Sequence, residues 1–194
     1  MAFRSINPAN GNTLRVVDAF TPAQIESALQ AAAAASASWR QVSIGERSAR
    51  LREAAAVLRR HAEEFAAIIT REMGKPIREA RAEIEKCAGV CEYYAAQGPA
   101  FLADEVIETD AGRSLVAWQP LGAVLAVMPW NFPFWQVFRF AAPALMAGNT
   151  ALLKHASNVP QCALAIESVF AEAGFPAGVF HSLMIPSGDR KSVV

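Results

Sequence analysis

Cysteine is scarce in this sequence, and its charges cancel. Three cysteines among 194 residues are too few for a disulfide framework, which favours a reduced, cytoplasmic protein. Eighteen Lys and Arg balance eighteen Asp and Glu, so the formal net charge is zero. A nucleic-acid partner requires a basic surface, and we therefore expect none. The hydrophobic content of 53% is enough for a large core in a globular protein.

The sequence also lacks a signal region and an uninterrupted apolar run that could span a membrane. Its first eight residues contain no apolar block of the kind that signal sequences carry. The one long apolar stretch, residues 121–138, contains two prolines and Asn131, which favour a buried core segment over a membrane helix. We therefore expect no membrane partner.

Residues 1–103 are predicted to form mainly amphipathic helices after an extended start. Residues 1–20 are expected to be extended, with a turn at Asn10-Gly11-Asn12. Beyond Pro76, apolar residues recur at intervals of three and four as far as about Gln97. This spacing predicts a long helix with one apolar face.

Two capping boxes predict where two earlier helices begin. Thr21 to Gln24 and Ser43 to Glu46 each place a hydroxyl at the N-cap and Gln or Glu at the third helical position. The first helix should end near Trp39. The second carries apolar residues on one face and should continue to Gly74, because glycine readily adopts the left-handed conformation that ends helices.

Cys87 and Cys91 lie four residues apart on the predicted apolar face, a spacing that could serve a metal ion. No further Cys or His pair in the sequence completes a four-ligand set. Free cysteine is among the most buried residue types. We therefore expect both thiols to lie in the core, and we expect no metal site.

Residues 104–120 are predicted to form a β-hairpin. Two loosely alternating runs, Glu105 to Glu108 and Leu115 to Trp118, flank Thr109-Asp110-Ala111-Gly112. The charged positions indicate an exposed ribbon that pairs with another subunit. We therefore expect a homo-oligomer.

The centre of the sequence predicts a strand, a rigid turn, a helix and a second strand. An apolar run, Ala123 to Val127, indicates a strand buried on both faces. Two prolines then bracket Trp130-Asn131-Phe132 and stop regular structure. A helix from Phe134 to Ala147 follows, and a second apolar run, Thr150 to Leu153, leads to Lys154.

The order of the elements predicts an α/β fold. A helix from Val159 to Ala173 and a third strand, Val179 to Ile185, complete a β-α-β-α-β unit in residues 121–194. This unit is the first half of a doubly wound, Rossmann-like parallel sheet, against which the N-terminal helices and the hairpin pack. Residues 187–190 would form the loop after the third strand.

Three polar residues could carry chemistry. In parallel sheets ligands lie at the carboxyl ends of strands, where Asn131 and Lys154 would emerge. The prolines beside Asn131 would hold its amide as a preformed oxyanion donor, whereas an ordinary asparagine in a turn only caps it. A single lysine at a strand end is commonly just solvated. Arg139 lies in an otherwise apolar helix and needs an anionic partner or access to water.

Four blocks of sequence stand out in order along the chain. They are Pro129 to Pro133 (PWNFP), Ala141 to Asn149 (AAPALMAGN), Leu152 to Lys154 (LLK) and Glu172 to Val179 (EAGFPAGV). Together they resemble the NAD(P)-dependent aldehyde dehydrogenases, and Asn7 to Gly11 and Glu72 to Pro76 also fit. The resemblance extends to about residue 185. It implies an aldehyde dehydrogenase-like fold that oxidises an aldehyde to the acid with NADP or NAD.

The resemblance assigns roles to the residues at the sheet edge. Asn131 would donate its side-chain amide to the oxyanion that forms when a cysteine attacks the aldehyde. The residues implied in cofactor binding are Val127, Met128, Pro129, Trp130, Lys154 and Ser157. The family often has glutamate at the position of Ser157. Loss of that carboxylate implies that a 2′-phosphate, and therefore NADP, is accepted.

Arg139 narrows the implied substrate. The chain is similar to the succinate-semialdehyde dehydrogenase branch, in which an arginine at this position contacts the carboxylate at the far end of the substrate. Arg139 and Trp135 are therefore the expected substrate-binding residues, for a small aldehyde with a distal carboxylate. An interface ion pair is the alternative role for Arg139.

The resemblance covers only part of the family's length. Residues 1–103 and 121–194 would belong to the cofactor-binding domain, with 104–120 as the oligomerisation ribbon. The glycine motif, general base and nucleophilic cysteine of the family lie downstream of the last residue. We therefore expect a truncated chain without its catalytic domain, inactive alone. The alternatives are a non-enzymatic truncated protein that binds nucleotide or another subunit, and an unrelated α/β binding module.

Overall fold

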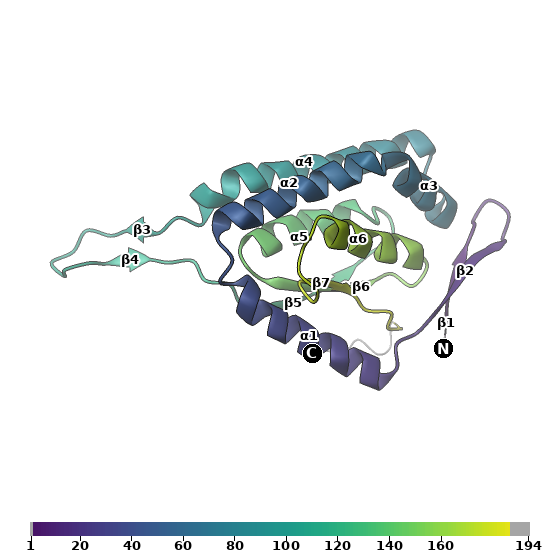
Figure 1. Ribbon diagram of the computed structural model, residues 1–194. Coiled ribbons are helices and arrows are strands. Elements are labelled where there is room, and N and C mark those ends of the chain that lie inside the picture. Colours follow the sequence, from purple (N-terminus) through teal and green to yellow (C-terminus); the bar gives the residue numbers. More distant parts are fainter. Residues whose placement is uncertain (1, 187–194) are drawn as a thin grey trace.

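Helices cover a three-stranded parallel sheet on both faces (Figure 1). The computed structural model describes residues 2–186 of the chain. The strands are β5 (Ala123–Met128), β6 (Thr150–His155) and β7 (Phe180–Ser182), in the order β5-β6-β7. One face packs against α1 (Pro22–Trp39), and the other against α5 (Trp135–Met146) and α6 (Pro160–Glu172). This arrangement confirms the predicted α/β fold and its β-α-β-α-β unit.

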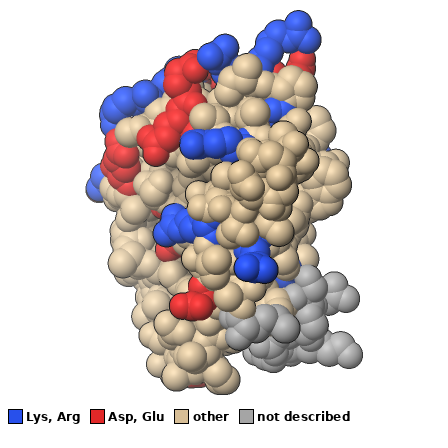
Figure 2. Space-filling view, turned by 90° about the vertical axis from the view of Figure 1, so that its right-hand side faces the viewer, with Lys and Arg blue, Asp and Glu red and all other residues tan. Residues whose placement is uncertain are grey.

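A further helical layer lies outside α5 and α6. Its members are α2 (Ile44–Arg60), α3 (Ala62–Met73) and α4 (Ile77–Phe101). On the face shown in Figure 2, charged side chains gather at the top, over this layer, while much of the rest is uncharged. Several charged side chains of this layer pair with each other, for example Arg59 of α2 with Glu85 of α4 at 2.8 Å. The outer layer thus presents a solvated surface that is largely neutralised within itself. No described helix is long and apolar enough to cross a membrane.

Two antiparallel hairpins extend from this body. The first, β1 (Ala2–Ile6) with β2 (Thr13–Asp18), contains the turn expected near residues 10–12, and its two extended runs pair with each other. The second is the predicted ribbon, in which β3 (Glu105–Val106) pairs with β4 (Leu115–Val116). It projects away from the helices (Figure 1). The hairpin prediction for residues 104–120 is confirmed.

Both capping boxes form as predicted. The Thr21 hydroxyl accepts the N–H of Gln24, and the Gln24 side chain accepts the N–H of Thr21 in return. Ser43 and Glu46 make the same reciprocal pair at the start of α2. Each box satisfies backbone N–H groups that have no partner within the helix, so the start of each helix is decided locally.

The prediction of one helix from residue 43 to Gly74 is wrong, because the chain leaves helical geometry at His61 (φ −104°, ψ 18°). The ring of His61 lies 3.2 Å from Glu172 on α6, and its centroid lies 5.6 Å from that of the tilted Phe65 ring. The contact to α6 joins residues 111 positions apart, which no local pattern can anticipate. The predicted end at Gly74 is correct, since this residue adopts a positive φ of 77°.

The helix predicted to end near Gln97 continues to Phe101, through Gly98 and Pro99. A Cβ atom at Gly98 would lie 2.5 Å from the Met146 side chain. Glycine therefore allows α4 to approach α5 closely at this point. The gain from this packing offsets the cost of a glycine and a proline in the helix.

The strand predictions need two corrections. Residues 123–127 were expected to be buried on both faces, but in β5 only Ala126 is fully buried, whereas all six residues of β6 are buried. The reason is position, because β5 lies at the edge of the described sheet and β6 lies between two neighbours. The third strand is shorter than residues 179–185, and the loop expected at 187–190 lies outside the described residues.

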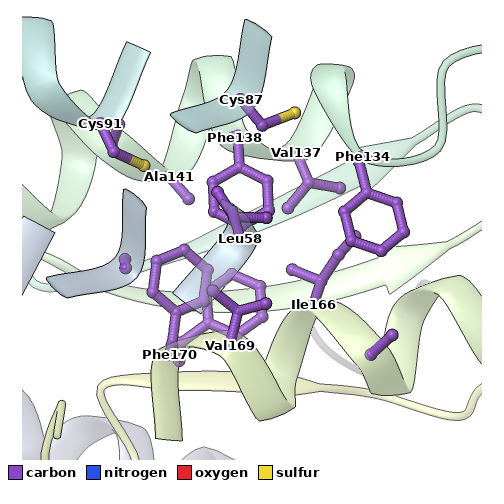
Figure 3. Close-up of a cluster of buried hydrophobic side chains, with 14 of the residues drawn as sticks. Leu58, Cys87, Cys91, Phe134, Val137, Phe138, Ala141, Ile166, Val169 and Phe170 are labelled. Atoms are coloured by element: carbon purple, nitrogen blue, oxygen red, sulfur yellow. The ribbon is translucent and has the colours of Figure 1, made fainter. Parts of the chain in front are cut away.

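The core lies between α4, α5 and α6 (Figure 3). Cys87 and Cys91 of α4 are fully buried in it, as predicted. Phe138 stacks on Phe170 at 5.2 Å and on Phe134 at 6.3 Å between ring centroids. Buried aromatic rings contribute large apolar areas. Because Phe134 directly precedes α5, this packing anchors the segment that enters the helix.

Candidate functional site at the carboxyl edge of the sheet

The candidate site lies where β5 and β6 end. The two strands run parallel and in register, with Val127 opposite Lys154 and Met128 opposite His155. The turn at residues 129–133 and the loop at 156–158 therefore leave the sheet at the same edge, which is where α/β sheets bind ligands. The structure thus brings the two predicted segments together.

The side chains of the turn are exposed. Trp130 is 49% exposed and Phe132 is 45% exposed, and Pro129 and Asn131 are exposed as well. Within residues 2–186, no group hydrogen-bonds the Asn131 side chain. The amide N–H groups of Asn131 therefore stay available as donors, and contacts of the neighbouring residues decide where they are held.

A buried carboxylate on α4 holds the exit of the turn. Glu83 is 3% exposed, and its Oε1 accepts the backbone N–H groups of Phe134 at 2.9 Å and Trp135 at 3.0 Å. Its Oε2 pairs with the ammonium of Lys75. That ammonium also lies 3.7 Å from the centroid of the Phe132 ring. The negative charge meets the positive end of the α5 dipole, which is favourable.

His155 holds the turn from β6. The ring is 5% exposed; Nδ1 accepts the N–H of Ala156 at 2.8 Å, so Nε2 carries the proton and donates to the carbonyl oxygen of Pro133 at 2.8 Å. Burial, aided by the charge of Lys154, lowers the pKa of His155 to about 4. The imidazole is therefore neutral at pH 7 and links the end of β6 to the turn.

Lys154 is buried, which contradicts the alternative of a solvated lysine at a strand end. It is 4% exposed, and its Nζ donates to the carbonyl oxygen of His155 at 2.9 Å. Of the other residues expected to bind cofactor, Val127 is 52% exposed, Ser157 is exposed and Met128 is half-buried. These side chains surround the point where the two strands end.

Trp135 and Arg139 lie four residues apart on α5, so they share one face of that helix. Trp135 is half-buried, and the ammonium of Lys86 lies 3.9 Å from its ring centroid. Arg139 is exposed, and no acidic side chain in the described chain forms an ion pair with it. An exposed guanidinium one turn beyond Trp135 is suited to binding a carboxylate.

The environment of the three cysteines makes their thiols unreactive. All are fully buried, and burial raises the pKa of Cys87, Cys91 and Cys162 well above that of a free thiol. The thiolate is the nucleophilic form of cysteine, so burial suppresses reactivity. Among residues 2–186, no cluster of three or more His, Cys, Asp or Glu is placed to hold a metal ion.

Sequence reasoning did not assign a role to Glu83, Lys75 or His155. Glu83 lies on the predicted α4 helix, 51 residues from Phe134. One signal was available: α5 begins without a capping side chain of its own. A helix start without a local cap requires a partner from elsewhere in the chain.

With this geometry established, comparison with known proteins identifies the class. The sequence matches the aldehyde dehydrogenase family over residues 1–193. The chain therefore belongs to the aldehyde dehydrogenase family.

The similar proteins indicate a particular branch of this family. The chain is 55% identical over 185 residues to the probable NADP(+) succinate-semialdehyde dehydrogenase of Synechocystis sp., covering 95% of this chain and 41% of that protein. It is 49% identical over 176 residues to the NAD(P)+ succinate semialdehyde dehydrogenase Sad of Escherichia coli, covering 91% of this chain and 38% of Sad. The chain thus spans about two fifths of the length of these relatives.

Solved structures of similar proteins have the same fold as this chain. The succinic semialdehyde dehydrogenase of Streptococcus pyogenes, in complex with NADP+, superposes with a TM-score of 0.94 at 36% identity, covering 99% of this chain and 42% of that one. Gox0499 superposes with a TM-score of 0.96 at 36% identity, over 100% of this chain and 42% of that one. The resemblance inferred from the sequence motifs is confirmed at the level of family and fold.

Proposed function

We propose that this chain is the cofactor-binding portion of an enzyme that oxidises succinate semialdehyde to the acid with NADP+ or NAD+. The observation that carries the proposal is the strand register, which brings the Asn131 turn and Lys154 to one sheet edge. The relatives that are 55% and 49% identical to this chain are succinate-semialdehyde dehydrogenases by name.

In this proposal Asn131 supplies an electrostatic contribution to catalysis. When a cysteine thiolate adds to the aldehyde carbon, the carbonyl oxygen becomes negatively charged, and the Asn131 amide donates a hydrogen bond to it. A donor that is already held in place has no reorganisation to undergo as the charge develops. The backbone contacts of Glu83 and His155 supply that preorganisation.

The cofactor would lie along the edge formed by Val127, Met128, Pro129, Trp130, Lys154 and Ser157. When bound, the nicotinamide accepts hydride from the substrate carbon. The residues fit this group, because exposed Trp130 offers an aromatic face and exposed Ser157 leaves room for a 2′-phosphate without a like-charged carboxylate. We therefore propose NADP as an accepted cofactor.

Arg139 would bind the carboxylate at the far end of the substrate, with Trp135 beside it. The exposed guanidinium has no acidic partner in the described chain, so a substrate carboxylate would supply the missing negative charge. Charge-assisted pairs between guanidinium and carboxylate are among the strongest hydrogen-bonded contacts.

We infer that the 194-residue chain does not catalyse this reaction alone. Its three cysteines are buried, and burial raises the pKa of each thiol. The nucleophile would then come from outside these residues. The direct test is to confirm the intact mass of 20.8 kDa and assay succinate semialdehyde with NAD+ and NADP+. Turnover by the mass-verified chain would overturn this inference.

The substrate is tested in a fusion enzyme, in which residues 1–185 of this chain replace the matching segment of Escherichia coli Sad. Arg139→Met should raise KM for succinate semialdehyde by about 10- to 100-fold, since hydrogen bonds to charged groups contribute roughly 1.5–3 kcal/mol. Butyraldehyde, which lacks the carboxylate, should be unaffected. Arg52→Met changes an exposed arginine on α2, in the outer helical layer, and serves as the control. Equal losses on both aldehydes would reject the assignment.

A second role, binding another subunit, is supported by the ribbon. Its exposed apolar residues include Val106 at 70% and Trp118 at 57%, followed by Leu121 at 92%. Contiguous exposed apolar side chains indicate an interaction surface. We propose that the ribbon pairs with a second copy, giving a homo-oligomer, in a cytoplasmic setting where cysteines stay reduced. A non-enzymatic protein would share this surface but would not show the selective response to Arg139→Met.

A further inference from the structure

The two helices that cover one face of the sheet both begin without a cap of their own. The N-cap residues, Phe134 for α5 and Val159 for α6, make no side-chain cap hydrogen bond. In each case a distant buried glutamate replaces the cap. Glu83 accepts the first N–H groups of α5, and Glu72 accepts those of Gln161 and Cys162 in α6 at 2.9 and 2.8 Å.

The two glutamates are equally buried, at 3% exposed each, but they use their oxygens differently. Glu72 gives one oxygen to each N–H group. Glu83 takes both N–H groups on Oε1, which frees Oε2 for Lys75. The Glu72 arrangement only caps a helix. The Glu83 arrangement also fixes a cation.

That cation extends the contact across the turn. The ammonium of Lys75, whose side chain is 9% exposed, lies over the ring of Phe132, the residue directly after Asn131. An ammonium with little access to water is attracted electrostatically to the face of an aromatic ring. Glu83 therefore acts at two places: directly at Phe134 and Trp135, which follow the turn, and through Lys75 at Phe132 within the turn.

We propose that Glu83 is a positioning residue for Asn131, and that its charge fixes the Asn131 amide through Lys75 and Phe132. The proposal rests on the oxyanion role proposed above. Reacting groups must be held within about 0.5 Å of the productive geometry. Since no described group bonds the Asn131 side chain, its placement depends on the backbone of the turn.

The test compares two isosteric variants in the 194-residue chain, Glu83→Gln and Glu72→Gln. Each converts one carboxylate oxygen to an NH2 group that faces another donor, Lys75 in the first variant and the Cys162 N–H in the second. Both should lower the melting temperature. If Glu83 only caps a helix, Glu83→Gln should speed exchange at Phe134 and Trp135 but leave the Asn131 side chain unchanged, as Glu72→Gln does.

The readout is ¹⁵N NMR of the Asn131 side-chain amide, with hydrogen exchange of the Phe134 and Trp135 backbone amides, which Glu83 bonds. We expect Glu83→Gln to shift the Asn131 resonance, lower its order parameter and speed exchange about tenfold or more, as loss of a charged hydrogen bond implies. Glu72→Gln should leave Asn131 unchanged. An unchanged Asn131 in Glu83→Gln, or equal changes in both variants, would overturn the proposal.

Phe132→Leu provides a second variant if Glu83→Gln does not fold. The position is 45% exposed, so the chain should tolerate it, and it removes the ring beneath Lys75 while leaving Glu83 intact. We expect the same loss of order at Asn131; no change would contradict the route through Lys75. None of these readouts requires turnover. Failure of the proposed function would appear separately, as a wild-type fusion enzyme that does not oxidise succinate semialdehyde.

Discussion

Two exposed segments of this chain, the turn at 129–133 and the ribbon at 104–120, are held in opposite ways. The side chains of Trp130 and Asn131 in the turn are exposed to solvent, but buried side chains hydrogen-bond the backbone at the end of the turn. Glu83 binds the N–H groups that follow it, and His155 binds the carbonyl oxygen of Pro133. Exposure at the turn is therefore combined with a rigid support.

The ribbon has no such support. Only two residue pairs form its strands, Glu105 with Val116 and Val106 with Leu115. Near its tip, Thr109 and Ser114 bond each other at 2.7 Å. These contacts lie within the ribbon itself, which projects from the body (Figure 1).

The difference separates two uses of an exposed surface. A polar group on a buried scaffold suits chemistry, because its position is fixed before a ligand arrives. An apolar ribbon with self-contained pairing suits association, because burial against a partner removes its exposed apolar area from water. Changes at the turn should therefore affect rate and acid stability, and changes at the ribbon should affect assembly alone.

The largest expected effect is at Asn131. In the fusion enzyme, Asn131→Ala should lower kcat by about 10²–10³, the usual loss for one oxyanion donor, with little change in KM. Thermal stability should be nearly unchanged, because the side chain is exposed. Asn12→Ala, an exposed asparagine in the β1–β2 hairpin, is the matched control. A kcat reduced less than about fivefold would remove Asn131 from catalysis.

The next effect is on stability in acid. His155 titrates near 6.5 when unfolded, but in the folded chain burial lowers its pKa to about 4. As pH falls from 6.5 to 4, the unfolded state takes up a proton and the folded state does not, so His155 costs about 3 kcal/mol of stability over this range. Urea unfolding at several pH values should show a smaller acid loss in His155→Gln.

His181 supplies the opposite control. Its ring lies 2.6 Å from Glu167, and this hydrogen bond raises the pKa of His181. The stabilisation is full below pH 6.5 and is lost as pH rises through the folded value. His181→Gln should therefore lower stability most in acid, whereas His155→Gln reduces the acid loss. Parallel pH profiles for the two variants would contradict both assignments.

These predictions also show which parts of the molecule the sequence could reveal. The capping boxes at Thr21 and Ser43 involve residues three positions apart, so both helix starts were predicted. The burial of Cys87 and Cys91 was predicted because helical spacing places both on the apolar face of one helix. The turn at 129–133 was located because proline acts on its own backbone and on its neighbour.

The missed features all depend on contacts between distant residues. The break at His61 coincides with a contact to Glu172, and the caps of α5 and α6 come from Glu83 and Glu72, 51 and 89 residues away. From the residues next to it in the sequence alone, a glutamate on a predicted helix is expected to be exposed to solvent. The burial of Glu72 and Glu83 therefore could not be predicted. Lys154 was located correctly, but its burial depends on the full set of elements around β6.

A smaller effect is expected at Ser157. In the fusion enzyme, Ser157→Glu should lower kcat/KM for NADP+ about tenfold while leaving that for NAD+ nearly unchanged. Two like charges about 4 Å apart repel by roughly 1–4 kcal/mol at dielectric constants between those of water and a protein surface. Ser27→Glu adds the same charge on the exposed side of α1 and is the control. An equal loss with both cofactors would place Ser157 away from the 2′-phosphate.

The smallest effect on folding should come from the ribbon. Val106 is 70% exposed, and Val106→Lys should change the free energy of unfolding of the 194-residue chain by less than about 0.5 kcal/mol. Leu58→Ala, in the core of Figure 3, should cost about 2–5 kcal/mol in the same urea titration. Sedimentation equilibrium should show the reverse order, because a lysine at Val106 disfavours burial of the ribbon against a second copy. If Val106→Lys destabilised the chain and left its association unchanged, the ribbon would be part of the fold, and the contrast with the turn would be wrong.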